Sequence, residues 1–126
     1  MSFTNFLETE ILDHVFAGAA YTAPATKYVG LFTAAPGEAG GGTELSGSAY
    51  ARQSMAFTTS GNTTSNNAAV EFPTATGSWG TVTHVGIFDA SSSGNLMAYA
   101  TLSASKAIAS GDVFRIPSGD LDITLD

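Results

Sequence analysis

The sequence predicts an all-β fold, an antiparallel β-sandwich or jelly-roll-like barrel with one N-terminal amphipathic helix. From Tyr21 onward, short runs rich in β-branched and aromatic residues alternate with turn-forming Gly, Ser, Asn and Pro, a pattern typical of strands. No helical segment separates these runs, so the strands should pair antiparallel. At 126 residues, the chain has the length of one domain. We expect a single domain over 1–126, with the helix in 1–18 and the sandwich in 21–126.

The only convincing helical pattern covers residues 2–17. Ser2 could cap this helix, or Asn5 could, with Glu8 three residues later in the manner of a capping box, and Gly18 is a plausible stop. A lone helix of this length is only marginally stable, so it must dock on the domain or on a neighbouring subunit. Its apolar side chains recur at helical spacing, at Phe3, Phe6, Leu7, Ile11, Leu12 and Val15.

The stretch from Ser78 to Ala90, SWGTVTHVGIFDA, is predicted to be the central strand. It contains the only tryptophan and is bounded by two turn-forming segments. We expect Trp79, Val85 and Ile87 in the core, and Gly86 at a close approach or a bulge in that strand. The other predicted strands are Lys27–Thr33, Tyr50–Thr58, Ala69–Phe72, Leu96–Leu102, Val113–Ile116 and Leu121–Leu125.

A long glycine-rich loop, AAPGEAGGGTELSGS, follows the first strand from Ala34 to Ser48. It lacks the Gly-Lys-Ser/Thr end of a phosphate-binding loop, and Glu38 and Glu44 give it the wrong charge for phosphate. A loop of this length inside one domain is unusual unless it has a function. We therefore expect it to contact a partner.

Composition excludes several classes of function. Acidic residues outnumber basic ones by 11 to 4, which argues against nucleic acid as a partner because Lys and Arg dominate phosphate binding. The absence of cysteine excludes disulfide frameworks and thiolate metal sites. No apolar run is long enough to span a membrane, and the N-terminus has acids where a signal peptide is positive. The low charged fraction, 12%, suits a surface that lies against another protein.

The residues that could support chemistry have simpler structural interpretations. His84 and Asp89 could form a base and its orienting acid, but residues five apart on a strand point to opposite faces. Asp120, Asp122 and Asp126 could hold calcium, but they alternate along one strand instead of converging from a tight turn. We expect no metal and no cofactor.

Two other classes of function are considered. A glycan-binding module could stack sugar rings on Trp79, Tyr50 or Tyr99, although such aromatics are more often part of a core or a sheet face. A depolymerase would need two carboxylates at a defined separation, and the acids to examine are Glu71, Asp89 and Asp112. We expect a protein that is not an enzyme.

The order of motifs resembles a family of small structural proteins of tailed bacteriophages, often labelled tail fibre or virion proteins. The specific segments are LFTAAPGEAGGGTE, YARQ and FPTATGSWGTVTHVGIFDA, and the resemblance extends from Phe3 to Asp126. It implies a non-enzymatic building block of the virion, assembled in the host bacterial cytoplasm. A fibre shaft would be long and repetitive, so a small decorating, cement or adaptor subunit is expected, with a glycan-binding module of a tail fibre as the alternative.

The expected partners are other virion proteins of the capsid or tail and further copies of the same chain in a homo-oligomer; the alternative function adds a host glycan. Neither a nucleic acid nor a membrane is expected as a partner. For Arg52, a structural ion pair or an inter-subunit contact is the default interpretation. The candidate interface combines the helix, the glycine-rich loop and the YARQ segment, with Phe3, Phe6, Leu7, Glu38, Glu44, Tyr50 and Arg52 as its residues.

Overall fold

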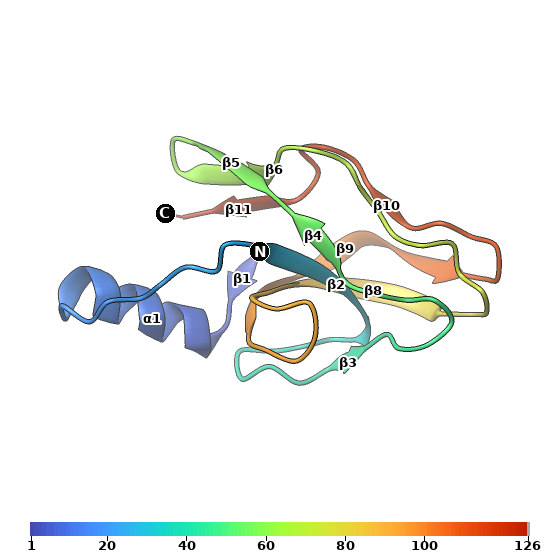
Figure 1. The fold of residues 1–126 in the computed structure, drawn as a ribbon, viewed down its shortest axis with the longest axis horizontal. Coiled ribbons are helices and arrows are strands. Elements are labelled where there is room, and N and C mark those ends of the chain that lie inside the picture. The colour runs from blue at the N-terminus through green and yellow to red at the C-terminus, as the bar shows by residue number, and fades with distance from the viewer. Residues whose placement is uncertain (126) are drawn as a thin grey trace.

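The computed structural model describes residues 1–125 and confirms the all-β fold (Figure 1). Most strands pair antiparallel, and the described sheets do not close into a barrel. The elements in chain order are β1 (Ser2–Phe3), α1 (Asn5–Phe16), β2 (Lys27–Ala34), β3 (Thr43–Glu44), β4 (Gln53–Met55), β5 (Phe57–Ser60), β6 (Thr63–Asn66), β7 (Val70–Glu71), β8 (Gly80–Phe88), β9 (Leu96–Ile108), β10 (Arg115–Ile116) and β11 (Asp122–Thr124).

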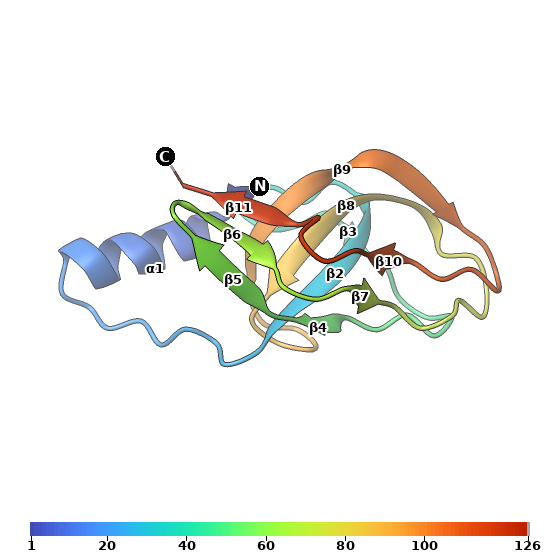
Figure 2. The same ribbon diagram turned by 90° about the horizontal axis from the view of Figure 1, so that it is seen from above.

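The main sheet has the strand order β1-β9-β8-β2-β3, and β4 also pairs with β2. β8 lies at its centre between β2 and β9, which confirms the Ser78–Ala90 stretch as the central strand. Two smaller sheets, β11-β6-β5 and β10-β7, form the second layer (Figure 2). The described chain contains no helix long and apolar enough to cross a membrane.

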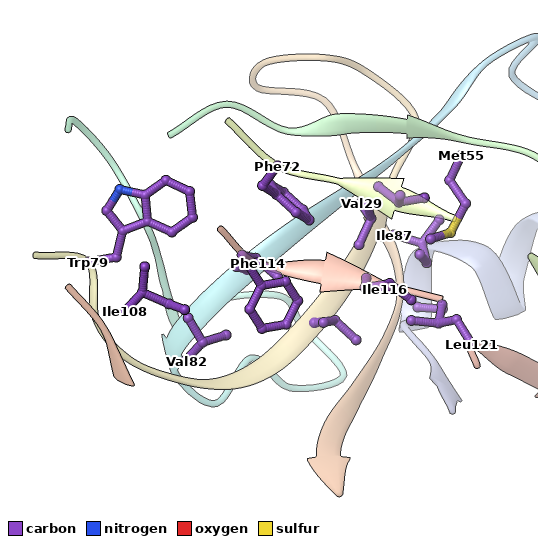
Figure 3. Packing of buried hydrophobic residues seen from close by; sticks show 14 of the residues in the cluster. Val29, Met55, Phe72, Trp79, Val82, Ile87, Ile108, Phe114, Ile116 and Leu121 are labelled. Atoms are coloured by element: carbon purple, nitrogen blue, oxygen red, sulfur yellow. The ribbon is translucent and has the colours of Figure 1, made fainter. Parts of the chain in front are cut away.

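The hydrophobic core lies between these layers (Figure 3). Trp79, Val85 and Ile87 are all buried, as the sequence predicts. The Trp79 indole fits this apolar site because its Nε1 donates a hydrogen bond to the Ser48 carbonyl at 2.9 Å, which satisfies its one polar group. Phe72 packs edge-on against Phe114 with ring centroids 5.8 Å apart.

The opposite face of the main sheet buries a second, smaller apolar group. Phe32 and Phe88 lie on neighbouring strands and stack with centroids 6.0 Å apart. They fit because the residues between them on this face are glycines: a Cβ on Gly86 would lie 2.8 Å from Phe32 Cε1, and one on Gly30 would lie 2.8 Å from Phe88 Cε2. The close approach expected at Gly86 is confirmed.

The helix begins later than expected. Residues Ser2 and Phe3 form β1 on the edge of the main sheet, and Thr4 is the N-cap, so the predictions of a helix from residue 2 and of a Ser2 or Asn5 cap were wrong. The reason is tertiary: Thr4 Oγ1 donates to the Leu96 carbonyl at 2.6 Å, and its backbone N–H donates to the Met97 carbonyl at 2.9 Å. Gly18 follows the helix with φ of 74°, as expected of a stop.

Several strand boundaries also differ from the prediction. The predicted strand Tyr50–Thr58 contains two short strands, β4 and β5, with Tyr50 and Arg52 outside both. The polar segment Thr63–Asn66 lies outside the predicted strands but forms β6, which pairs with β5 and β11. Threonines form this strand although they show no apolar alternation, because β6 is held between two partner strands.

Candidate docking surface

Helix α1 extends away from the strands at one end of the molecule, and the chain returns beside it to β2 (Figures 1 and 2). No side chain of the described helix is fully buried. Three apolar side chains near its C-terminal end face solvent: Leu12 is 57% exposed, Val15 61% and Phe16 81%. Apolar side chains that lie together at the end of a projecting helix are a candidate contact surface for another protein.

The N-terminal part of the helix contacts its own domain. Phe3, Phe6 and Leu7 are half-buried and pack against the hydrophobic core. The Phe6 ring also meets the Tyr21 ring edge-on, with centroids 6.4 Å apart. The returning segment is attached to the last turn of α1, since the Tyr21 backbone N–H donates to His14 Nδ1 at 3.1 Å. These contacts anchor the helix and leave its far end uncovered.

The glycine-rich loop lies against the start of α1. The Glu38 carbonyl accepts a hydrogen bond from the Asn5 backbone N–H at 2.9 Å, and Glu38 Oε1 accepts one from the Tyr99 hydroxyl at 2.9 Å. That hydrogen bond to a carboxylate raises the pKa of Tyr99 above its ordinary value. A hollow of about 610 Å³ lies between the loop, the helix start and the β8–β9 turn. Loop and helix therefore form adjoining parts of one surface.

Glu44, Tyr50 and Arg52 come together, but they bind one another. Arg52 Nε and Nη2 donate to the two Glu44 carboxylate oxygens at 2.7 and 2.8 Å. The Tyr50 hydroxyl accepts from the Leu31 backbone N–H at 3.0 Å and donates to Glu44 Oε2 at 3.2 Å. Burial raises the pKa of Tyr50 well above its ordinary value. We call these three residues the Arg52 cluster.

The Arg52 cluster fixes two loops on the main sheet. Arg52 Nη1 donates to the carbonyls of Ala90 at 2.9 Å and Ser93 at 2.8 Å, both in the β8–β9 turn. Its guanidinium carbon lies 3.4 Å from the Phe88 ring centroid, a cation–π geometry. Only 9% of the Arg52 side chain is exposed, so its contacts in this structure are within the chain.

The aromatic residues considered for sugar stacking do not form a shared exposed platform. Trp79 is 5% exposed and lies in the core. Tyr50 stacks on Phe72 with centroids 6.1 Å apart and meets Trp79 edge-on at 5.6 Å. Tyr99 alone lies near the surface, bonded to Glu38. Of the three aromatic residues named for sugar stacking, Tyr99 is thus the one placed near the surface.

The candidate catalytic acids and the histidine have separate structural partners. Asp89 accepts hydrogen bonds from the backbone and side-chain nitrogens of Asn95 at 2.7 and 2.9 Å, which closes the β8–β9 turn. His84 Nδ1 lies 2.8 Å from Thr83 Oγ1. Asp112 accepts from the Ala109 backbone N–H at 2.9 Å.

The remaining acids lie on exposed strands and turns. Glu71 is paired across the sheet with Arg115. Asp122 accepts a hydrogen bond from Ser65 Oγ on the neighbouring strand. Asp120 is exposed, and Asp126 lies outside the described residues. Within the part of the chain that the structure describes, no group of three or more His, Cys, Asp or Glu side chains is arranged to hold a metal ion.

The apolar face predicted from the sequence grouped Leu12 and Val15 with Phe6 and Leu7 and left out Phe16, whereas the structure leaves Leu12 and Val15 exposed. Leu12, Val15 and Phe16 are spaced i, i+3 and i+4, so they form an apolar stripe of their own on a helix. The earlier stripe, with Phe6 and Leu7, is the one that meets the core. Two apolar stripes on one helix are consistent with two contacts, one within the chain and one outside it.

Comparison with known proteins gives one family. No curated protein matches the chain. The family model described as podophage GP4 fiber I protein gp80 matches residues 2–124, nearly the whole chain. This match confirms the resemblance to structural proteins of tailed bacteriophages and associates the chain with the virion. The chain belongs to the family of the podophage GP4 fiber I protein gp80.

Proposed function

We propose that this protein is a non-enzymatic adaptor or decorating subunit that docks on a neighbouring virion protein through α1 and the adjoining glycine-rich loop. The observation behind the proposal is the uncovered stripe of Leu12, Val15 and Phe16 on a helix that extends beyond the domain. Burying a large apolar side chain contributes about 1.5 to 3 kcal/mol, so this stripe is a strong candidate for the centre of an interface.

The charges of α1 indicate the charge that the partner's surface should carry. Helix α1 contains Glu8, Glu10 and Asp13, and the chain has no Lys or Arg before Lys27. A complementary surface is an apolar groove with basic residues at its rim. The Arg52 cluster supports docking indirectly, because it holds the loop and the β8–β9 turn in place beside the helix start. A rigid loop loses less conformational entropy on binding.

The experiment compares one triple variant with one single-substitution control in phage particles. Leu12→Gln, Val15→Gln and Phe16→Gln together retain good helix formers and remove the apolar stripe. Deleting residues 1–18 would be less clean, since it also removes β1 and the buried Thr4. The matched control is Val113→Gln, which makes the same kind of change at a side chain 39% exposed elsewhere.

Incorporation is measured by quantitative mass spectrometry of purified particles, with circular dichroism of the isolated proteins to check the fold. We expect the triple variant to fold and to be absent from particles, and Val113→Gln to be incorporated normally. Normal incorporation of the folded triple variant would exclude this surface as the interface.

No observation favours the glycan-binding alternative, since the aromatic residues it needs are buried or bonded within the chain. The homo-oligomer expected from the sequence is a separate proposal on a separate surface. Assembly in the host cytoplasm is part of the proposed function, as for any virion subunit incorporated before the particle is released.

A further inference from the structure

The two edges of the main sheet are covered unequally. At one edge, β2 is paired with both β3 and β4. At the other edge, β9 is paired with β1, where Ser2 and Phe3 lie opposite Tyr99 and Ala98. Within the described chain, no strand lies on the outer side of β9 between Ala100 and Lys106. We call this segment the open edge.

Part of the open edge lacks strand partners on its inner side as well. Val82 of β8 pairs with Lys106 and His84 pairs with Thr101, so Leu102–Ser105 lie opposite Thr83 alone. Unpaired backbone groups on an extended segment are a template for another strand. Residues 100–105, ATLSAS, contain no proline and no charge, two of the devices that protect an edge from pairing. A third device is present, because the register between β8 and β9 shifts between Val82 and His84 and makes this part of β9 a bulge.

A hollow of about 410 Å³ lies along the open edge, between β9 and the segment that contains β10. Figure 2 shows β9 curving past β10 on this side of the molecule. The buried side chains Phe114, Ile116 and Leu121 contribute to its lining. A strand added at the edge would therefore find backbone partners beside a hollow whose apolar floor is already packed into the core.

The charges that line this hollow are those of Lys106, Arg115, Asp120 and Asp122 and the amino group of Met1, which lies next to Ser2 at the Tyr99 end. Lys106 lies near the C-terminal end of β9, and Arg115 follows shortly after in β10. Asp120 and Asp122 line the same hollow. The residue that follows Asp122, Ile123, lines a second hollow together with Phe3 and Ala98, which places the two acids near the other end of the open edge. One end of the open edge thus carries Lys106 and Arg115, and the other carries two acids beside one amino group, which leaves it net acidic.

We propose that the open edge pairs antiparallel with the open edge of a second copy of this chain, about a two-fold axis near Ser103. Such an axis places the basic end of one copy beside the acidic end of the other, and the uncharged middle segments meet. A two-fold interface must be self-complementary, and this charge arrangement satisfies that condition although each chain has a net charge of −7. The α1 surface is acidic only and does not satisfy it. The inference does not depend on the docking function proposed above.

Sedimentation velocity of the full chain tests the proposal, at concentrations up to about 1 mM, where even a weak dimer is populated. We expect the mass to rise from the 12.8 kDa monomer toward the dimer. Hydrogen exchange at the amides of Ala100–Lys106 should slow as the dimer forms. A monomer at every concentration, with exchange independent of concentration, would refute the proposal and would indicate that the bulge in β9 protects the edge.

Substitutions locate the contact. Ser103→Lys places two like charges beside the axis and should abolish the dimer, whereas Ser91→Lys makes the same change in the exposed β8–β9 turn and should leave it intact. Lys106→Glu and Asp120→Lys should each raise the dissociation constant several-fold, and the two together in one chain should restore it. A dimer that survives Ser103→Lys, or that is lost in the Leu12, Val15 and Phe16 variant, would place self-association elsewhere and refute the assignment.

Discussion

Replacing Arg52 with methionine should destabilise the protein strongly, although the residue lies outside the main hydrophobic core. The substitution keeps most of the apolar stem and removes the charge. It leaves the Glu44 carboxylate without its cation and the carbonyls of Ala90 and Ser93 without their donor. The Arg52 side chain is 9% exposed and that of Glu44 23%, so solvent compensates only part of the loss.

The magnitude follows from the burial of the pair. Removing one partner of a buried ion pair costs about 3 to 5 kcal/mol, because the other charge stays buried and unpaired. Glu44 retains some contact with water, so we expect the lower value, about 3 kcal/mol, not the value below 1 kcal/mol of an exposed pair. For a domain of this size that corresponds to a decrease in Tm of about 12 °C.

Urea and thermal unfolding followed by circular dichroism measure this difference. The matched control is Arg115→Met on the exposed strand β10, which should change the free energy of unfolding by no more than about 0.5 kcal/mol. The double variant of Arg52→Met and Glu44→Gln removes the unpaired charge and should recover about 1 to 2 kcal/mol. If Arg52→Met destabilises no more than Arg115→Met does, the Arg52 cluster contributes little to stability and the reasoning fails.

Two further predictions concern the same face of the sheet. Gly86→Ala should destabilise the protein by about 1 to 3 kcal/mol, because the added Cβ would lie 2.6 Å from Leu96 Cδ1 and 2.8 Å from Phe32 Cε1. Gly37→Ala, whose added Cβ has its nearest neighbour 3.9 Å away, is the control in the same unfolding assay. Equal stability of the two variants would contradict the close approach. Burial raises the pKa of Tyr50 in the folded state, so the contribution of the protonated Tyr50 to the free energy of unfolding is complete below the unfolded pKa of 10.0 and is lost as the pH rises above it, by up to about 1.4 kcal/mol per pH unit. Tyr50→Phe should therefore be less stable than the original protein at pH 8 but should lose less stability between pH 10 and 11. Parallel pH profiles of the two proteins would count against this assignment.

The local sequence determines the features whose causes are local. β-Branched and aromatic residues between turn-forming segments specify β2 and β8, and the apolar residues of the Ser78–Ala90 stretch lie in the core as predicted. Gly18 ends the helix because a residue without a Cβ adopts φ of 74° at no steric cost. Membership of a phage structural family was also recognisable from the sequence, since its motifs span nearly the whole chain.

Tertiary structure decided the features whose partners lie far away in the chain. Thr4 stays extended, and α1 begins only after it, because Thr4 Oγ1 bonds a carbonyl 92 residues away. The polar segment Thr63–Asn66 is a strand because β5 and β11 flank it. Arg52 belongs to an internal cluster because two loops converge on it. The uncovered stripe of α1 and the open edge of β9 likewise depend on which neighbours the fold supplies, and no local pattern encodes the absence of a neighbour.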